Sequence, residues 1–123
     1  MKWLMILANG FEDVEAIATI DVLKRAHVNL TVATLHNKDT VITSHNNQLV
    51  VDTHLKDINY VDYDFLIIPG GQAVFKELDG NKLVDEIVND FCSKKKLVSA
   101  ICAAPTILGL MGYLRDKKFT CWS

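Results

Sequence analysis

A strand-to-helix junction lies in the segment Lys96-Leu-Val-Ser-Ala-Ile-Cys102-Ala-Ala-Pro-Thr-Ile-Leu-Gly-Leu-Met-Gly112. The first part of this segment is a short apolar run of strand length, and the second part has the apolar spacing of a helix. Cys102 stands at the junction between small residues, so a tight turn there meets no bulky neighbour. Pro105 suits the first turn of the following helix because its φ is already helical. The segment therefore predicts a strained turn that presents one cysteine above the edge of a sheet.

A cysteine at such a junction has two interpretations. At the start of a helix, unpaired N–H groups and the helix dipole favour an anion, so the pKa of the Cys102 thiol is expected to fall below the ordinary value of about 8.5. The thiol would then be a nucleophile. Free cysteines are also among the most buried residues in proteins, and the segment by itself fits a packing cysteine equally well.

Composition restricts the class of protein. The chain has 123 residues, of which 50% are hydrophobic, and a net charge of −2, which suits one domain with a real core. The balanced charge offers no basic surface, and we expect no nucleic-acid partner. The sequence has no apolar run of the roughly 18 residues that a membrane span needs, and we expect no membrane association. Three cysteines without metal-ligand spacing favour a reducing, cytoplasmic location over a disulfide framework.

Apolar runs of strand length alternate with helical periodicity, which is typical of βαβ units and a mainly parallel sheet. Strands are predicted at residues 3–8, 30–35 and 64–68, in the segment before Cys102, and from residue 118 to residue 123; a small hairpin is predicted within 37–52. Helices are predicted at residues 12–27 and 82–95. The first is expected to bury Val14, Ile17, Ala18, Val22 and Leu23, and the second Leu83, Ile87, Val88 and Phe91.

Ligands of an open parallel sheet bind beyond the carboxyl ends of its strands, so the residues that follow each strand are candidates for a site. Glu12 and Asp13 begin the first predicted helix, where acidic side chains complement the helix dipole, and we interpret them in this way. Glu15 lies one turn into that helix and is predicted to point back and share a hydrogen bond with a thiolate. Gly70 and Gly71 follow a buried strand; they form either a plain turn or a close backbone approach whose N–H groups bind an oxyanion.

The other ligand-type side chains give no second site. Four histidines are spaced nine residues apart, at His27, His36, His45 and His54. This spacing matches neither one helix face nor a zinc-binding pair, so we expect no metal, and we place these residues in loops and at strand ends. Cys121 is interpreted as a core residue on a strand, with a resolving thiol for Cys102 as the alternative. Cys92 is expected to be inert.

Four short motifs occur in order along nearly the whole chain: Gly10-Phe-Glu-Asp-Val-Glu-Ala16, Asp21-Val-Leu-Lys-Arg-Ala26, Ile68-Pro-Gly-Gly71 and Ala100-Ile-Cys-Ala-Ala-Pro105. Together they resemble the ThiJ/PfpI family, the Parkinsonism-associated deglycase superfamily with a class I glutamine amidotransferase-like fold. The resemblance implies a flavodoxin-like three-layer α/β/α sandwich with a mainly parallel sheet, formed as a single domain by residues 1–123.

The resemblance also implies a site and a set of activities. Cys102 would be the nucleophile, Glu15 would hydrogen-bond to its sulfur, and Gly70, Gly71 and Ala103 would provide the backbone oxyanion and substrate-binding groups. The family is commonly dimeric, and its members have been assigned as glyoxalases and deglycases, as peptidases, as chaperones and as oxidative-stress sensors. For this chain we expect a homodimer, a small carbonyl substrate and no cofactor. We therefore expect glyoxalase or deglycase chemistry on methylglyoxal or its adducts, with a cysteine-based oxidative-stress sensor or a chaperone as the alternatives.

Two features depart from the family pattern. Trp122 stands where many members have a histidine near the cysteine, which weakens a peptidase-like Cys-His interpretation more than thiolate chemistry with Glu15. The C-terminal part of the family fold is also missing from this chain. We therefore expect an exposed sheet edge and apolar face, which would belong to a truncated product, an incompletely recorded chain or a surface that a partner covers.

Overall fold

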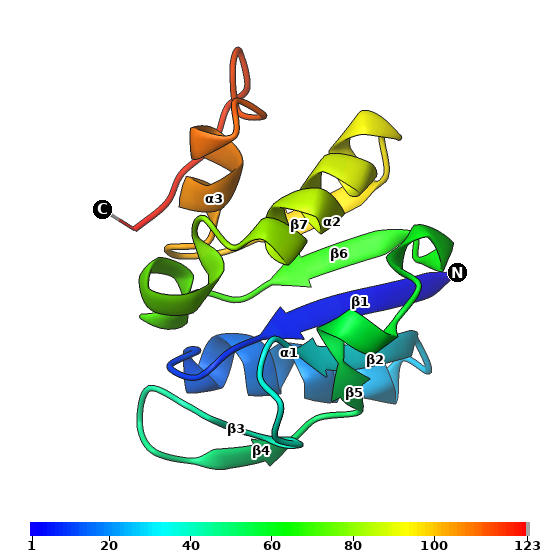
Figure 1. Cartoon of the computed structure of the whole chain (residues 1–123), viewed down its shortest axis with the longest axis vertical. Coiled ribbons are helices and arrows are strands. Elements are labelled where there is room, and N and C mark those ends of the chain that lie inside the picture. Colours follow the sequence, from blue (N-terminus) through cyan, green and yellow to red (C-terminus); the bar gives the residue numbers. More distant parts are fainter. Residues whose placement is uncertain (123) are drawn as a thin grey trace.

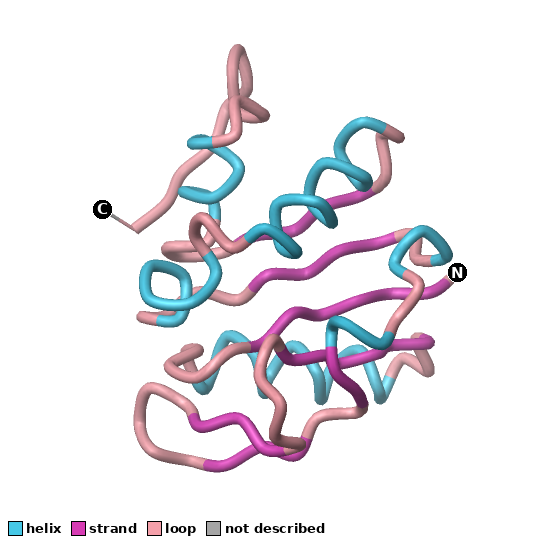
Figure 2. Tube along the Cα trace, in the orientation of Figure 1, coloured by secondary structure: helices cyan, strands magenta, loops and turns pink. Residues whose placement is uncertain are grey.

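The computed structural model describes residues 1–122 and is built on a five-stranded sheet (Figure 1). The strands are β1 (Lys2–Leu7), β2 (Asn29–Thr34), β5 (Thr53–His54), β6 (Phe65–Ile68) and β7 (Leu97–Ala100). They lie in the order β5-β2-β1-β6-β7, and all neighbouring strands pair in parallel (Figure 2). The predicted α/β fold with a mainly parallel sheet is therefore confirmed.

Three helices accompany the sheet: α1 (Asp13–Arg25), α2 (Lys82–Ser93) and α3 (Pro105–Leu110). Helix α1 connects β1 to β2 in one direction along the sheet, whereas α2 connects β6 to β7 in the opposite direction. Because parallel crossovers are right-handed, α1 and α2 lie on opposite faces and the sheet is the middle layer. The direction in which successive strands are added to the sheet reverses between β1 and β6. Open α/β sheets bind ligands at such a reversal.

The core is centred on β1 and on the inner face of α2. Residues 4–7 of β1 are almost completely buried, which fits a strand covered on both faces. In α2 the predicted inward residues Ile87, Val88 and Phe91 are fully buried, and Leu83 is half-buried beside them. Asn81 caps this helix by accepting hydrogen bonds from the N–H groups of its first turn.

The predicted inner face of α1 is confirmed only at Leu23, which packs against the core, and is wrong at the other four positions. Val14 and Val22 are 70% and 61% exposed, and Ile17 is also exposed, whereas Ala16 is buried against the sheet. Apolar residues surround most of this helix, so their periodicity shows that the helix is apolar but does not decide which side packs. Tertiary packing selects the side with Ala16, and an exposed apolar face is left on the other.

The segment between β2 and β6 forms the predicted hairpin and two short 3₁₀ turns. β3 (Thr40–Ile42) and β4 (Gln48–Val50) pair antiparallel, as expected. β5 adds a parallel strand of two residues beside β2, which was not predicted because so short a run carries no periodicity. In Figure 1 the β3–β4 hairpin lies at one end of the molecule and α3 at the other.

The chain after α3 differs from the prediction. Residues 118–122 form no strand, and Cys121 is exposed instead of buried in the core; the last residue of the predicted strand, Ser123, lies outside the described residues. A strand needs a ladder, whereas here a single hydrogen bond from the Trp122 N–H to the Cys102 carbonyl, 2.8 Å long, ties the segment to the protein. β7 is consequently an edge strand, and the exposed edge expected from the sequence is present.

Candidate active site

Three chain segments meet beyond the carboxyl ends of β1, β6 and β7. Glu15 comes from the first turn of α1, the Gly70–Gly71 pair follows β6, and Cys102 follows β7. The carboxyl ends of adjacent parallel strands lie on the same edge of a sheet, which brings together residues that are 31 to 87 positions apart in the sequence. No helix within residues 1–122 has the length and apolar character that crossing a bilayer demands.

Cys102 occupies the strained turn that the sequence predicts. Its φ is +61°, in the left-handed region that residues other than glycine rarely adopt. Ala103 and Ala104 are buried directly after it, so larger side chains there would collide with the core. Cys92 lies on α2, away from this turn, and burial raises the pKa of its thiol.

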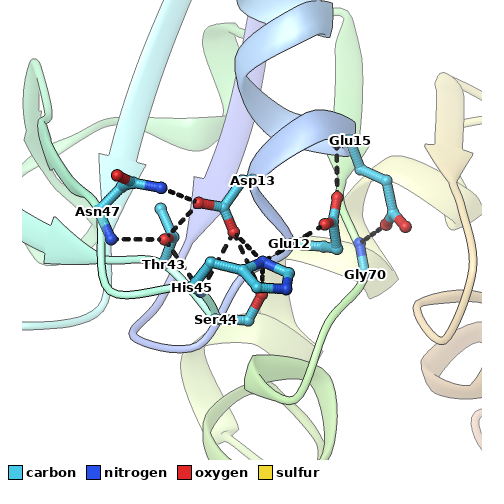
Figure 3. A network of polar contacts seen from close by, with 8 residues as sticks. All are labelled: Glu12, Asp13, Glu15, Thr43, Ser44, His45, Asn47 and Gly70. Atoms are coloured by element: carbon cyan, nitrogen blue, oxygen red, sulfur yellow. Dashed lines mark hydrogen bonds and ion pairs between the residues drawn. The ribbon is translucent and has the colours of Figure 1, made fainter.

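Gly70 allows Glu15 and Cys102 to approach each other. The Gly70 N–H donates a hydrogen bond of 2.8 Å to Glu15 Oε1 (Figure 3). A Cβ at position 70 would lie 2.7 Å from both Cys102 Cβ and Glu15 Oε1, closer than real Cβ contacts. Glu15 thus occupies the donor that sequence reasoning assigned to an oxyanion, so Gly70 holds the carboxylate next to the cysteine.

A glycine is needed at position 71 for a different structural reason than at position 70. Its φ is +98°, and a Cβ there would lie 2.5 Å from the Glu12 nitrogen and 2.6 Å from the Gly10 oxygen. The backbone N–H groups of Gly71 and Ala103 lie on the side of the Cys102 thiol, where they act to lower its pKa. These two amides are therefore the candidate backbone donors beside the sulfur, where an oxyanion formed by addition of the thiol would develop.

The pKa of the Cys102 thiol is raised, which corrects the decrease expected from the sequence. Burial is the largest cause; the negative charge of Glu15 and its hydrogen bond with the thiol add to it, while the Ala103 and Gly71 amides oppose it. The dipole argument fails here because α3 is only six residues long and begins three residues after the cysteine. A carboxylate in direct contact outweighs so weak a dipole.

A cavity of about 300 Å³ opens beside the sulfur. It is lined by Gly71, Gln72, Phe75, Cys102, Ala103 and Trp122. Trp122 thus stands in the wall of this cavity, in the region where a catalytic histidine was sought. None of the cavity residues that the structure describes is a histidine.

A hydrogen-bond network fixes the start of α1 next to this site (Figure 3). The Asp13 carboxylate accepts hydrogen bonds from Thr43 Oγ1 at 2.5 Å, Asn47 Nδ2 at 2.6 Å and His45 Nδ1 at 2.9 Å. The Thr43 hydrogen bond contributes most to holding the pKa of Asp13 far below its ordinary range, and burial opposes it. Asp13 therefore anchors the loop of residues 43–47 to α1. The sequence had predicted only that this carboxylate complements the helix dipole.

The same network places one histidine beside carboxylates. Glu12, Asp13 and His45 offer ligand atoms within 4.8 Å of one another. Sequence spacing missed this group because more than 30 residues separate His45 from the two acids. Asp13 is the main cause of the raised pKa of His45, through the hydrogen bond and its charge. Glu12 also caps α1 by accepting from the Glu15 N–H at 3.0 Å, so this group is organised by the chain's own contacts.

These observations define an α/β protein with a doubly wound, mainly parallel sheet and a cysteine on a strand-to-helix turn. The model of the DJ-1/PfpI family matches residues 1–123, and the chain belongs to this family. Protein DJ-1alpha of Drosophila melanogaster is 39% identical over 118 residues, which are 95% of this chain and 54% of that protein. The Parkinson disease protein 7 homolog of Danio rerio is 37% identical over 106 residues, which are 85% of this chain and 56% of that protein.

Solved structures agree with this assignment. Oxidized DJ-1 of Toxoplasma gondii superposes with a TM-score of 0.90 at 27% sequence identity, and the match covers 98% of this chain and 66% of that one. Drosophila melanogaster DJ-1beta superposes with a TM-score of 0.83 at 36% identity over 91% of this chain and 61% of that one. The chain thus spans between about half and two thirds of the length of these relatives.

Proposed function

We propose that the protein converts small 2-oxoaldehydes, with methylglyoxal as the reference substrate, by glyoxalase or deglycase chemistry at Cys102. The carrying observation is the surroundings of Cys102: the Glu15 carboxylate next to it across Gly70, the backbone N–H groups of Gly71 and Ala103, and an adjoining cavity. A thiol with a raised pKa is protonated at neutral pH, so it needs a base at the moment of attack. Glu15, hydrogen-bonded to the thiol, is placed to be that base.

In this reaction the thiol proton passes to Glu15 as the sulfur adds to the aldehyde carbon and forms a hemithioacetal. The Gly71 and Ala103 amides stabilise the oxygen that becomes negative. Glu15 next passes the thiol proton to this oxygen, which completes the neutral hemithioacetal and frees the carboxylate. The carboxylate then moves the proton of the former aldehyde carbon to the neighbouring ketone carbon, while the hydroxyl proton passes to the ketone oxygen, which leaves a thioester and a new hydroxyl. Water hydrolyses the thioester, so that methylglyoxal and water give lactic acid and the free thiol. One carbon is oxidised and its neighbour reduced, so the balance requires no redox cofactor.

The test is consumption of methylglyoxal and formation of lactate by the wild type, Cys102→Ala and Cys121→Ala. We expect turnover in the wild type and in Cys121→Ala, because Cys121 is exposed and does not line the cavity. Cys102→Ala is expected to lose at least about a hundredfold in kcat/KM, because the variant has no nucleophile to which Glu15 can act as a base. Equal turnover by the wild type and Cys102→Ala would refute the assignment.

A cysteine-based oxidative-stress sensor is the second candidate. The same donors and Glu15 around the sulfur suit the oxygens of a sulfinic acid, and the Toxoplasma gondii relative is described as oxidized. Two hydrogen peroxide molecules would convert the thiol first to sulfenic and then to sulfinic acid, releasing two waters. Oxidation confined to Cys102 by peptide mass, together with absent aldehyde turnover, would favour this function. If the protein is instead a chaperone, the Cys102→Ala variant would still protect client proteins from aggregation.

We further propose that the protein works as a homodimer in the cytoplasm. The exposed apolar face of α1, formed by Val14, Ile17 and Val22, supports an association of this kind, because monomers rarely expose a continuous apolar face on one helix. A peptidase mechanism has less support, since an aromatic ring and not an imidazole stands by the cysteine.

A further inference from the structure

Two aromatic rings stand at the mouth of the Cys102 cavity. The centroids of Phe75 and Trp122 lie 6.4 Å apart, and the ring planes are tilted by 53°. Phe75 comes from the π-helical turn Val74–Leu78 that follows Gly71, whereas Trp122 comes from the segment after α3. Segments from two different parts of the chain therefore bring their rings to one cavity.

Neither ring contributes to the hydrophobic core. Phe75 is 49% exposed and Trp122 61% exposed, and both are absent from the cluster of buried and packed apolar side chains. Exposure of large aromatic surface costs free energy and serves no packing need here. A ligand in the cavity would remove this surface from water.

The chemistry of the cavity wall discriminates among carbonyl substrates. None of its six described residues carries a formal charge, so a phosphate or carboxylate on the substrate would find no ion-pair partner there. Gln72 is the one lining side chain with an amide, which can hydrogen-bond a carbonyl oxygen. A volume of about 300 Å³ lies at the low end for ligand sites and suits a small, flat molecule.

We propose that this cavity selects 2-oxoaldehydes that carry an aromatic group over those that carry a small alkyl group, an inference that rests on the proposed function. The aldehyde carbon lies at the Cys102 sulfur while the aromatic ring packs against Trp122 and Phe75. A methyl group covers less of the two exposed rings than an aryl group does. Offset or edge-to-face contacts between aromatic rings add affinity beyond the area that they bury, and this gain applies only to the aryl substrate.

Phenylglyoxal and methylglyoxal are the probes. We expect kcat/KM for phenylglyoxal to exceed that for methylglyoxal by about tenfold, the scale of one or two aromatic contacts. The reaction has the same stoichiometry as the conversion of methylglyoxal to lactic acid, so phenylglyoxal and water give mandelic acid. Trp122→Leu and Phe75→Leu are expected to lower this preference several-fold, because they reduce kcat/KM for phenylglyoxal more than kcat/KM for methylglyoxal. Phe119→Leu is the matched control, because Phe119 is exposed on the same segment and does not line the cavity.

A binding measurement separates this inference from the reaction. In Trp3→Phe the only remaining tryptophan is Trp122, and acetophenone, which has no aldehyde, is expected to quench its fluorescence saturably. Equal or greater kcat/KM for methylglyoxal would overturn the aromatic preference and leave the proposed function intact. Absence of turnover with both aldehydes would refute the proposed function, and the fluorescence titration would then decide the aromatic site. No saturable quenching would overturn it.

Discussion

The Gly70 N–H and Glu15 Oε1 are joined by a 2.8 Å hydrogen bond that spans 55 residues of sequence. This bond connects the end of β6 to the first turn of α1. It also directs the carboxylate to the Cys102 thiol, because no side chain at position 70 separates the two. A backbone amide and a missing Cβ therefore set the distance between a candidate base and a candidate nucleophile.

Gly70→Ala is expected to lower the free energy of unfolding by about 1 to 3 kcal/mol, the scale of overpacking in a tight site. The added Cβ would lie 2.9 Å from the Ile101 carbonyl oxygen as well as against Glu15 and Cys102, so the backbone has to shift. Urea unfolding measures the loss. Gly109→Ala is the matched control: its Cβ would make only an ordinary 3.6 Å contact with Leu114, and a helical alanine stabilises. Equal stability of the two variants would contradict this account.

Glu15→Gln is expected to lower the pKa of the Cys102 thiol, because the charge of Glu15 and its hydrogen bond with the thiol both raise it. The rate of iodoacetamide labelling at Cys102 against pH, read by peptide mass, gives the midpoint. Turnover of methylglyoxal is expected to fall about a hundredfold in the same variant, since the base is lost although the thiolate forms more readily. Glu86→Gln, on the exposed side of α2, is the control. A midpoint that stays or rises would show that Glu15 places no net negative charge at the sulfur.

Asp13→Asn is expected to release the loop of residues 43–47. The amide has one acceptor oxygen in place of two, so it cannot accept all of the hydrogen bonds from Thr43, Asn47 and His45 that the carboxylate accepts. Faster amide hydrogen exchange in this loop, and unchanged exchange in Asp116→Asn, would be the signature; identical exchange in the two variants would rule the anchor out.

The same anchor predicts a dependence on acid. A carboxylate whose pKa is lowered by folding stabilises the native state above its ordinary pKa of about 4, and the contribution is lost as the pH falls through the folded value. We therefore expect the wild type to lose more stability than Asp13→Asn between neutral and strongly acidic pH. Parallel stability curves for the two proteins would contradict the lowered pKa.

Val22→Lys is expected to convert a dimer into a monomer. Val22 lies on the exposed apolar face of α1, and a buried lysine without a partner is costly at an interface. Sedimentation equilibrium gives the molar mass, and Val61→Lys, an exposed valine on a 3₁₀ turn, is the control. A wild-type protein that stays monomeric at micromolar concentration would refute association through α1.

Some elements were predictable because they depend on local pattern. The buried strands β1 and β6 are continuous apolar runs between turn residues, and α2 has one clear apolar face. The turn at Cys102 was predictable from its small neighbours and Pro105, and the structure confirms it by the positive φ. In α1 the same reasoning chose the wrong face, because apolar residues nearly surround that helix.

Some features of the candidate site were likewise predictable from the sequence, and others were not. Residue type and place after each strand identified Glu15, Gly71 and Cys102, but not the Gly70–Glu15 hydrogen bond or the sign of the thiol pKa shift. Both depend on distances between segments that the chain brings together from far apart.

The sequence by itself determined the strands, their alternation with helices and the strained turn, because apolar periodicity and turn residues act over a few neighbouring positions. Only the tertiary structure decided which face of α1 is buried, that Asp13 anchors the 43–47 loop, and that Phe75 and Trp122 face one cavity. Burial and electrostatic contact depend on which surfaces meet across the sheet edge, and a local pattern contains no information on that meeting.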